Sequence, residues 1–392
     1  MSIGQGIALL IVPLYALDLG GSPASAAVIF ACRGLGNMIA DLPAGYAAQR
    51  FGDAYVMKAG VVLMIIAALG AAMANSLPQL GVFTAVIGVS MATWLLARLT
   101  LISDRVSTEF RGQALSGLAG LQRVGNFLGP ILGGYLAYIA NYQLAFALIA
   151  CLAGITLLLV LTYSTDAPSK VERSPLLAGT AETQVEHSRR SITALLGEYR
   201  LIFMTAGCVV FLLTLLRAAR TLLLPLWGAH LGLNAAEIGF VVGLAAALDM
   251  MMFPLAGLIM DHQGRRISAG ACLSLLSAGI VAIALSSNTL EFTLAACLAG
   301  LGNGIGSGIN MTLGTDFAPA DRRGSFLGIW RFIGDSGSFV GPSLISALTS
   351  ALGLVSSMWV SAVLGVFGLM ILLGFVPETL RQTDRKTRGQ AA

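Results

Sequence analysis

The chain is built from apolar runs that are long enough to cross a lipid bilayer. A helix needs about 20 apolar residues to span ~30 Å of hydrocarbon. Backbone groups in lipid must bond within their own segment, so each run must be helical. Charged residues make up only 11% of the 392 residues, and the mean hydropathy is +0.84. We therefore predict an all-α integral membrane protein with twelve transmembrane helices, near residues 3–19, 25–47, 55–75, 79–101, 113–138, 142–163, 200–230, 236–260, 267–286, 290–312, 325–348 and 354–376.

The last six runs repeat the glycine, proline and arginine positions of the first six. One offset of 212 residues relates them, which indicates a duplicated unit. The predicted fold is therefore two six-helix pseudo-symmetric bundles, and function is expected where the bundles meet. The related positions are Gly45 and Gly257, Gly52 and Gly264, Arg111 and Arg323, Gly125 and Gly337, Gly129 and Gly341, Pro130 and Pro342, Pro13 and Pro225, and Asp104 and Asp316.

Composition divides the chain into four parts. An N-terminal bundle over residues 1–163 precedes a polar linker over 164–199, and a C-terminal bundle over 200–376 precedes a tail over 377–392. Lys and Arg fall in alternate loops, with the linker and the tail among the basic segments, and short cytoplasmic loops retain these residues. Both termini are therefore expected in the cytoplasm. Short termini and loops favour a bacterial inner membrane.

The first predicted helix is short for its place in the repeat. Residue 1 falls on Leu213 under the offset, whereas the matching seventh helix begins near Arg200. We expect the first helix to lack its opening turns.

The loop between the eighth and ninth helices carries a signature. It reads Gly257-Leu-Ile-Met-Asp261-His-Gln-Gly264-Arg265-Arg266 and resembles the loop motif of the major facilitator superfamily. Glycines allow close helix approach there, and arginines reach carboxylates or helix carbonyls. The resemblance implies a cytoplasmic latch, and the alternative is a basic loop that only sets topology. The latch residues would be Gly257, Asp261, Gly264 and Arg265, with Asp316 and Arg323 as neighbours.

The first-half copy of this loop departs from the motif. Gln49 stands at the aspartate position, and Asp53 and Ala54 replace the basic pair. Latching in the first half is then expected to fall to Asp104 with Arg105 or Arg111.

The fifth helix carries a glycine and proline motif that resembles the antiporter motif of the drug:proton antiporter, or multidrug efflux, branch. Glycines at helical spacing leave a smooth face for close packing, and the proline bends the helix. Glycine-rich packing without a role in transport mode is the alternative interpretation. The motif residues are Gly125, Gly129, Pro130, Gly133 and Gly134.

Charged residues inside the spans are costly in hydrocarbon and tend to face a partner or a cavity. Counting residues from the helix ends places Arg123 level with Asp249, on helices that border each other across the bundle interface in the superfamily fold. State-dependent pairing of this kind can couple proton uptake to rocking. A static structural pair is the alternative.

The same count predicts a ladder between the second and eleventh helices. Its rungs are Arg33 with Asp335 and Asp41 with Arg331. An intrahelical pair between Arg331 and Asp335, four residues apart, is the alternative. Arg98 lies near a helix end, where its long side chain can extend to water.

Two arginines in the seventh helix give the clearest indication of cargo. Arg217 and Arg220 share one helical face, and the equivalent residues Gln5 and Ala8 offer no carboxylate. Unpaired guanidinium groups facing a cavity bind anionic groups well. An organic anion or a zwitterion is therefore the expected cargo. The predicted substrate-binding residues are Arg217, Arg220, Arg33, Tyr15 and Trp227.

These features predict a secondary active transporter that exports a small organic compound by proton antiport and alternating access. Uptake of an organic anion with protons, and a non-transporting sensor or scaffold of the same fold, are the alternatives. No catalytic triad, metal-ligand cluster or phosphate-binding Gly-rich loop occurs in the sequence, so neither enzyme activity nor a cofactor or metal is expected. The expected partners are a small molecule, protons and lipid, without nucleic acid, and the protein is expected to be a monomer.

Overall fold

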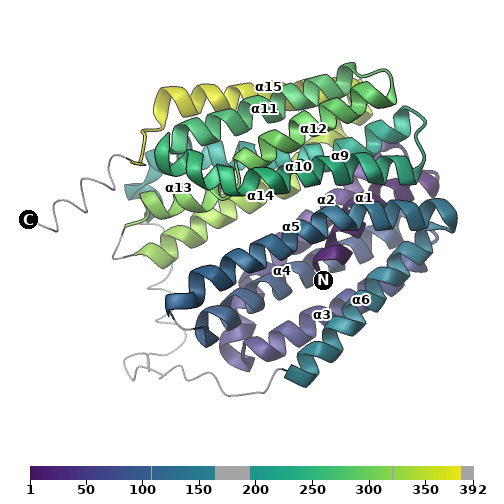
Figure 1. The fold of residues 1–392 in the computed structure, drawn as a ribbon, viewed down its shortest axis with the longest axis horizontal. Coiled ribbons are helices and arrows are strands. Elements are labelled where there is room, and N and C mark those ends of the chain that lie inside the picture. Colours follow the sequence, from purple (N-terminus) through teal and green to yellow (C-terminus); the bar gives the residue numbers. More distant parts are fainter. Residues whose placement is uncertain (107, 164–194, 320–321, 381–392) are drawn as a thin grey trace, which may run out of the picture.

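The computed structural model describes residues 1–106, 108–163, 195–319 and 322–380 (Figure 1). Within these ranges the chain forms helices and turns, with no β-strand. Nine of the described helices are long and apolar enough to cross a membrane by length and composition. The first helix is shorter, and the two helices of 32 and 30 residues that carry the glycine motifs are more polar. The predicted twelve-helix membrane fold is confirmed.

The first bundle contains six helices, joined by short turns. They are α1 (Ser2–Asp18), α2 (Pro23–Phe51), α3 (Asp53–Ala72), α4 (Leu77–Arg105), α5 (Thr108–Ile139) and α6 (Tyr142–Tyr163). All six agree with the predicted spans to within five residues at each end. The linker predicted over residues 164–199 lies mostly outside the described residues, and the four-part division of the chain stays a prediction.

The second bundle has two spans that are not plain α-helices. The first of its spans comprises α8 (Arg200–Ile202), the π-helix η2 (Phe203–Gly207) and α9 (Cys208–His230). The fourth breaks between α12 (Thr289–Ile305) and α13 (Ile309–Phe317), where Gly308 has a φ of +83° that favours glycine. The prediction of one continuous helix over residues 290–312 was therefore wrong. The other spans are α10 (Ala235–His262), α11 (Arg265–Leu285), α14 (Arg323–Leu352) and α15 (Leu354–Phe375).

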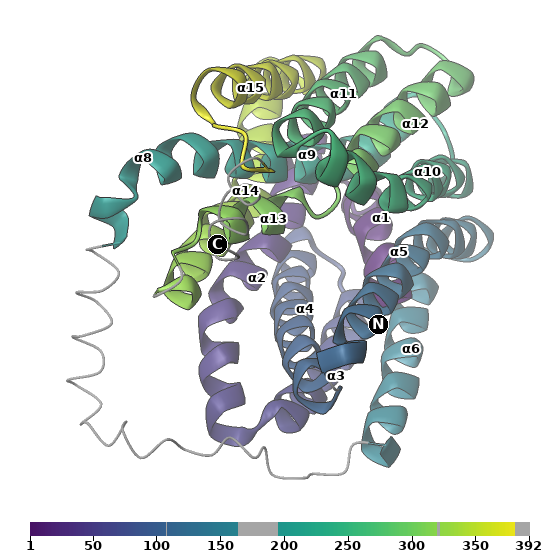
Figure 2. The ribbon, with the colours of Figure 1, turned by 60° about the vertical axis from the view of Figure 1, so that its left-hand side comes forward.

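The two bundles lie side by side and converge toward one end of the molecule (Figures 1 and 2). Between them α5 packs on α10, α2 packs on α14, and α1 contacts α9. We call the other end, where α6 ends and α8 begins, the linker end. The bundles diverge toward it.

Glycines bring the helix backbones together where the bundles converge. A Cβ on Gly134 of α5 would clash with the backbone carbonyl of Ala235 in α10, and one on Gly34 of α2 would lie 2.7 Å from the carbonyl oxygen of Ser338 in α14. Such approaches are typical of small-residue interfaces in membranes, where dispersion contacts replace the hydrophobic effect as the driving force. The inter-bundle contact is therefore tightest away from the linker end.

The helices at this interface run antiparallel in a constant register. On α2 and α14, Ser346 donates to the carbonyl of Ala24, Gly34 abuts Ser338, and Arg331 pairs with Asp41. Asn37 is therefore level with Asp335. The interface of α5 and α10 keeps the same register and places Arg123 level with Asp249.

We predict that Gly134→Ala separates α5 from α10 and destabilises the protein by about 1–3 kcal/mol, because the added methyl group meets backbone that cannot move aside cheaply. Thermal unfolding of detergent-solubilised protein measures the effect. Gly120→Ala on the same helix is the control, since a Cβ there meets no atom within 4 Å. Equal melting temperatures for the two variants would contradict this packing.

Candidate functional site

An ion pair joins the two bundles at Arg123 and Asp249. Arg123 Nη1 lies 2.8 Å from Asp249 Oδ1, and Arg123 Nη2 donates to Ser307 Oγ at 2.7 Å. The second carboxylate oxygen of Asp249 accepts from Asn303 at 2.6 Å. The guanidinium also lies 4.4 Å from the ring centre of Phe253. Both charged groups are thus bonded on two sides, and each side chain is at most 20% exposed.

A second inter-bundle pair links α2 and α14. Arg331 Nη2 lies 3.3 Å from Asp41 Oδ1, and Arg331 Nε lies 3.1 Å from Asp335 Oδ2 on its own helix. The inter-bundle rung and the intrahelical alternative therefore both form, on one arginine that serves two carboxylates.

The other predicted rung, Arg33 with Asp335, does not form. Arg33 lies level with Phe339, one helical turn beyond Asp335, and its guanidinium sits 5.1 Å from the ring centre of Phe30. Its Nε is buried without a hydrogen-bond partner. The two predicted rungs are incompatible with one register, because Arg33 and Asp41 are eight residues apart on α2 whereas the two α14 residues are only four apart. The register that pairs Asp41 with Arg331 therefore carries Arg33 one turn past Asp335.

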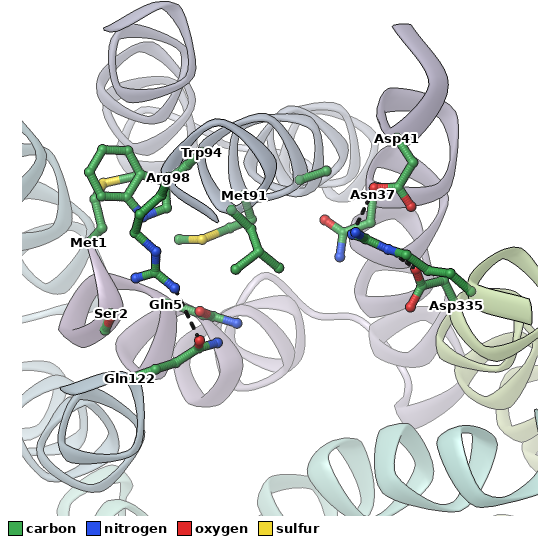
Figure 3. Close-up of a pocket in the computed structure, with 13 residues that line it drawn as sticks. Met1, Ser2, Gln5, Asn37, Asp41, Met91, Trp94, Arg98, Gln122 and Asp335 are labelled. Carbon is green, nitrogen blue, oxygen red and sulfur yellow. Dashed lines mark hydrogen bonds and ion pairs between the residues drawn. The ribbon is translucent and has the colours of Figure 1, made fainter. Parts of the chain in front are cut away.

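A cavity of about 100 Å³, open to solvent, lies between the bundles on the linker side of the packed interface (Figure 3). Ligand cavities commonly measure about 300–1,000 Å³, so this cavity is smaller than a typical ligand pocket and suits only a small molecule. Arg98 and Gln122 lie on one wall, and Asn37, Asp41 and Asp335 lie on the other, with Met91 between them. Arg98, which was expected to extend to water, lines this cavity. The remaining lining residues are Met1, Ser2, Gln5, Ala92, Trp94, Leu95 and Arg331.

None of the five residues predicted to bind substrate lines this cavity. Tyr15 is 1% exposed and donates to the Ala74 carbonyl, while Trp227 is 4% exposed and donates to Ser286 Oγ. Both are packing residues of the buried core. The guanidinium of Arg33 packs on Phe30 of its own helix, α2. Arg217 and Arg220 lie in α9 of the second bundle.

Arg217 and Arg220 bond to backbone carbonyls. Arg217 Nη2 donates to the carbonyl of Gly306 at 2.6 Å, where the break between α12 and α13 frees that group from the helix. Arg220 Nη1 donates to the carbonyl of Ala299 at 3.4 Å, and Arg220 is only 8% exposed. Asp249 is already occupied by Arg123 and Asn303, so neither arginine has a carboxylate partner among the described residues. Their role in substrate binding stays a prediction.

Three of the six predicted latch residues, Arg265, Asp261 and Asp316, meet at the linker end of the second bundle. Arg265 Nε lies 3.2 Å from Asp316 Oδ2, and Arg265 Nη1 lies 3.5 Å from Asp261 Oδ1. Gly264 turns the chain with a φ of +113°. Gly257 faces open space, and Arg323 is exposed at the start of α14. The side chains of Asp104, Arg105 and Arg111, expected to latch the first bundle, lie outside the described residues.

Residues beyond α15 cap the latch, which the sequence interpretation did not foresee. Glu378 accepts from the backbone N–H groups of Arg265 and Arg266 at 2.9 and 3.0 Å, at the N-terminus of α11. Thr379 donates to Asp316 at 2.6 Å. Burial alone would raise the pKa of Glu378, but the backbone donors, including that of Leu380, outweigh it and lower the pKa below its usual value. The cap therefore holds a charged carboxylate at a positive helix end.

Glycines of the antiporter-like motif divide between two neighbours. Cβ atoms on Gly125, Gly129 and Gly133 would press on α1, and one on Gly134 would press on α10. Pro130 offers its carbonyl beside Gly239 of α10. The motif thus packs α5 within its own bundle and across the interface, and a link to antiport stays a prediction.

Comparison with known proteins assigns the chain to a family. The model of the Major Facilitator Superfamily matches residues 1–341 and 206–392. The chain belongs to the Major Facilitator Superfamily. The uncharacterized transporter YddS of Bacillus subtilis is 29% identical over 320 residues, covering 76% of this chain and 70% of that protein. A cis,cis-muconate transport protein of Acinetobacter baylyi is 23% identical over 329 residues, covering 80% of this chain and 76% of that one.

The fold of this superfamily member agrees with solved transporter structures. The nucleoside transporter NupG, solved as a point mutant, superimposes with a TM-score of 0.76 over 96% of both chains at 12% identity. At that identity the likeness shows the fold alone. Its relatives by sequence are transporters of varied cargo, so transport is the activity of the group to which the chain is similar.

Several polar residues of this transporter's interface were missed from the sequence. Asn303 and Ser307 complete the bonding of Arg123 and Asp249, and Asn37 and Gln122 line the cavity. Uncharged polar residues stand out little in a Leu- and Gly-rich helix, so composition gave no signal. The repeat did contain a signal for one of them, because the 212-residue offset relates Asn37 to the charged residue Asp249.

We predict that the Arg123–Asp249 pair shows a coupling free energy of about 1–3 kcal/mol in a double-mutant cycle with alanine, because removing either partner leaves a poorly hydrated charge. Unfolding in mixed micelles measures it. The Arg322–Glu198 pair is the matched control, since its side chains are 30% and 51% exposed and such pairs contribute about 0–1 kcal/mol. Additive single effects at Arg123 and Asp249 would contradict the bonded pair.

We predict that Glu378→Gln lowers stability near pH 7 by about 0.5–1 kcal/mol, through loss of a charged cap on α11. The folded-state pKa of Glu378 is lowered, so its contribution is present above the unfolded-state pKa and disappears as pH falls through the folded-state value. Melting temperatures of the two proteins should therefore converge below about pH 4. Asp18→Asn, an exposed carboxylate at the opposite end, is the control. A pH-independent difference would contradict the assignment.

Proposed function

We propose that this protein is a proton-coupled antiporter that exports a small organic compound bearing an acidic group. The observation that carries the proposal is the Asp41–Arg331 ion pair, which joins the two bundles and at the same time lines the cavity between them. Rocking that changes access to the cavity would alter the distance across this pair. A proton on the carboxylate weakens the pair, so proton binding and bundle movement are linked.

The Arg123–Asp249 pair supports the same mechanism on the other interface. It lies at the matching level between α5 and α10 and must also yield when the bundles separate. Asn303 remains on the Asp249 carboxylate from within the second bundle, so that carboxylate is not left without a partner. We assign Asp41, Asp335 and Asp249 as the proton-responsive groups, and Arg123 and Arg331 as their inter-bundle partners.

Direction and orientation follow from two further features. The glycine and proline motif of α5 resembles that of drug:proton antiporters, and its close packing on α1 and α10 supports a rocking interface, which favours efflux. Lys and Arg gather in the loops at the linker end, which supports a cytoplasmic location for that end and for both termini in a bacterial inner membrane. We take the monomer as the working unit.

Proton-coupled uptake of an organic anion is the second candidate. Away from their ends, the spans hold six arginines against three aspartates, which leaves an excess of positive charge facing partners or cavities. These residues are Arg33, Arg98, Arg123, Arg217, Arg220 and Arg331 with Asp41, Asp249 and Asp335. Similarity to the muconate transport protein over 80% of this chain also favours an organic acid as cargo. Transport in the opposite direction would use the same ion pairs.

We predict that compounds exported by this protein release protons when they are added to energised everted vesicles, as measured by dequenching of an acridine dye. A host strain with and without the protein is first tested for protection against a panel of toxic organic acids and amphipathic compounds. Asp41→Asn, Asp249→Asn and Asp335→Asn should each remove or shift the pH dependence of flux, because the amide mimics a permanently neutral carboxyl group. Asp18→Asn is the control.

Three outcomes discriminate among the candidates. Unchanged pH dependence in all three variants would refute proton coupling through these pairs. Accumulation of an organic anion, without protection against any compound, would favour uptake. A protein that moves none of the compounds in either direction would favour the sensor or scaffold.

A further inference from the structure

The repeat relates the two inter-bundle interfaces residue by residue. Under the 212-residue offset, Arg123 corresponds to Asp335 and Asp249 corresponds to Asn37. Each pair sits at the same level of its own interface, as the helix register shows. An arginine and an aspartate that neutralise each other between α5 and α10 thus correspond to an aspartate and an asparagine between α2 and α14. The second interface lacks the positive group that the first one has.

The α2 and α14 wall of the cavity therefore has too few donors. Asp41 and Asp335 share a single arginine, Arg331, which gives them one hydrogen bond each from its guanidinium. The Oδ1 atom of Asn37, one helical turn from Asp41, is buried without a partner. Buried polar atoms in native proteins are normally bonded. Three oxygen-bearing groups with one unit of uncompensated negative charge face the cavity here.

The opposite wall has the reverse imbalance. Arg98 makes one long hydrogen bond, from Nη2 to Gln122 Oε1 at 3.4 Å, and its Nε is buried without a partner. No carboxylate from the described residues pairs with it. Gln5 of α1 lies on the same side of the cavity, where Figure 3 shows Arg98 and Gln122 reaching inward. A planar guanidinium with free donors is suited to a carboxylate.

We propose that the cavity binds a zwitterion, with a primary ammonium group at Asp41, Asp335 and Asn37 and a carboxylate at Arg98. An ammonium group carries three donors and one positive charge, which matches three acceptor groups and the charge missing from that wall. Met91 lies between the walls, and Trp94 and Leu95 also line the cavity, so its apolar side chains suit an apolar spacer. This inference rests on the proposed function and names the cargo class of the same site.

The test measures binding directly, so it does not depend on transport. The probes are ω-amino acids from glycine to 6-aminohexanoate, each with the unbranched monocarboxylate and the primary amine of matching length. Saturable rises in melting temperature of the detergent-solubilised protein give apparent affinities at neutral pH. We expect at least one chain length to bind about tenfold or more tightly than both of its single-charge analogues, because each lost charged hydrogen bond leaves a group unpaired.

Two variants assign the ends of the ligand. Arg98→Gln should weaken the best ω-amino acid about 10- to 100-fold and leave the amine analogue unaffected. Asp335→Asn should weaken the same probe and leave the carboxylate analogue unaffected. Arg200→Gln and Asp18→Asn change exposed charges away from the cavity and should alter neither affinity.

Equal affinity for the ω-amino acid and its monocarboxylate would overturn the proposal in favour of an anion site. Equal affinity for the amine would overturn it in favour of a cation site, and absence of binding at every chain length would overturn it outright. The comparison of probes on the unmodified protein stands even where a variant fails to fold. Loss of proton coupling in vesicles with retained zwitterion binding would refute the proposed function alone.

Discussion

Close packing of helix backbones between the two bundles is the contact on which the rest of the structure depends. Gly34, Gly134 and Gly239 remove the side chains that would keep α2 from α14 and α5 from α10. With no hydrophobic effect between helices in lipid, such close contact supplies much of the attraction. It also sets the register that brings Asp41 to Arg331 and Arg123 to Asp249. The cavity lies on the linker side of this contact, where the helices diverge.

Duplication explains both the scaffold and its asymmetry. Gly125 and Gly129, which agree with Gly337 and Gly341 under the repeat, pack α5 on α1 and α14 on α9, so the two bundles share the same internal packing. Charged and polar residues that differ, such as Asn37 opposite Asp335 against Asp249 opposite Arg123, make one interface electrically complete and leave the other with excess acceptors. The proposed ligand or proton in the cavity would offset this imbalance.

Sequence patterns predicted the helices and the Arg123–Asp249 and Asp41–Arg331 pairs, because periodic apolar runs and costly charges are visible without a structure. They failed where the pairing of two side chains depended on the helix register to within one turn. Arg33 and Asp335 were expected to meet and lie a turn apart. The break at Gly308 and the Glu378 cap on α11 were also unforeseen, since both depend on contacts far along the chain.

The sequence by itself determined that this chain crosses a membrane as two related helical bundles with charges buried between them. Lipid leaves the backbone no other conformation, so composition and length suffice for that conclusion. Only the tertiary structure decided which charges are satisfied and which face open space. That distinction rests on interhelical register and on hydrogen bonds at about 3 Å. A shift of one turn, about 5.4 Å along a helix, is enough to exchange a paired side chain for an unpaired one.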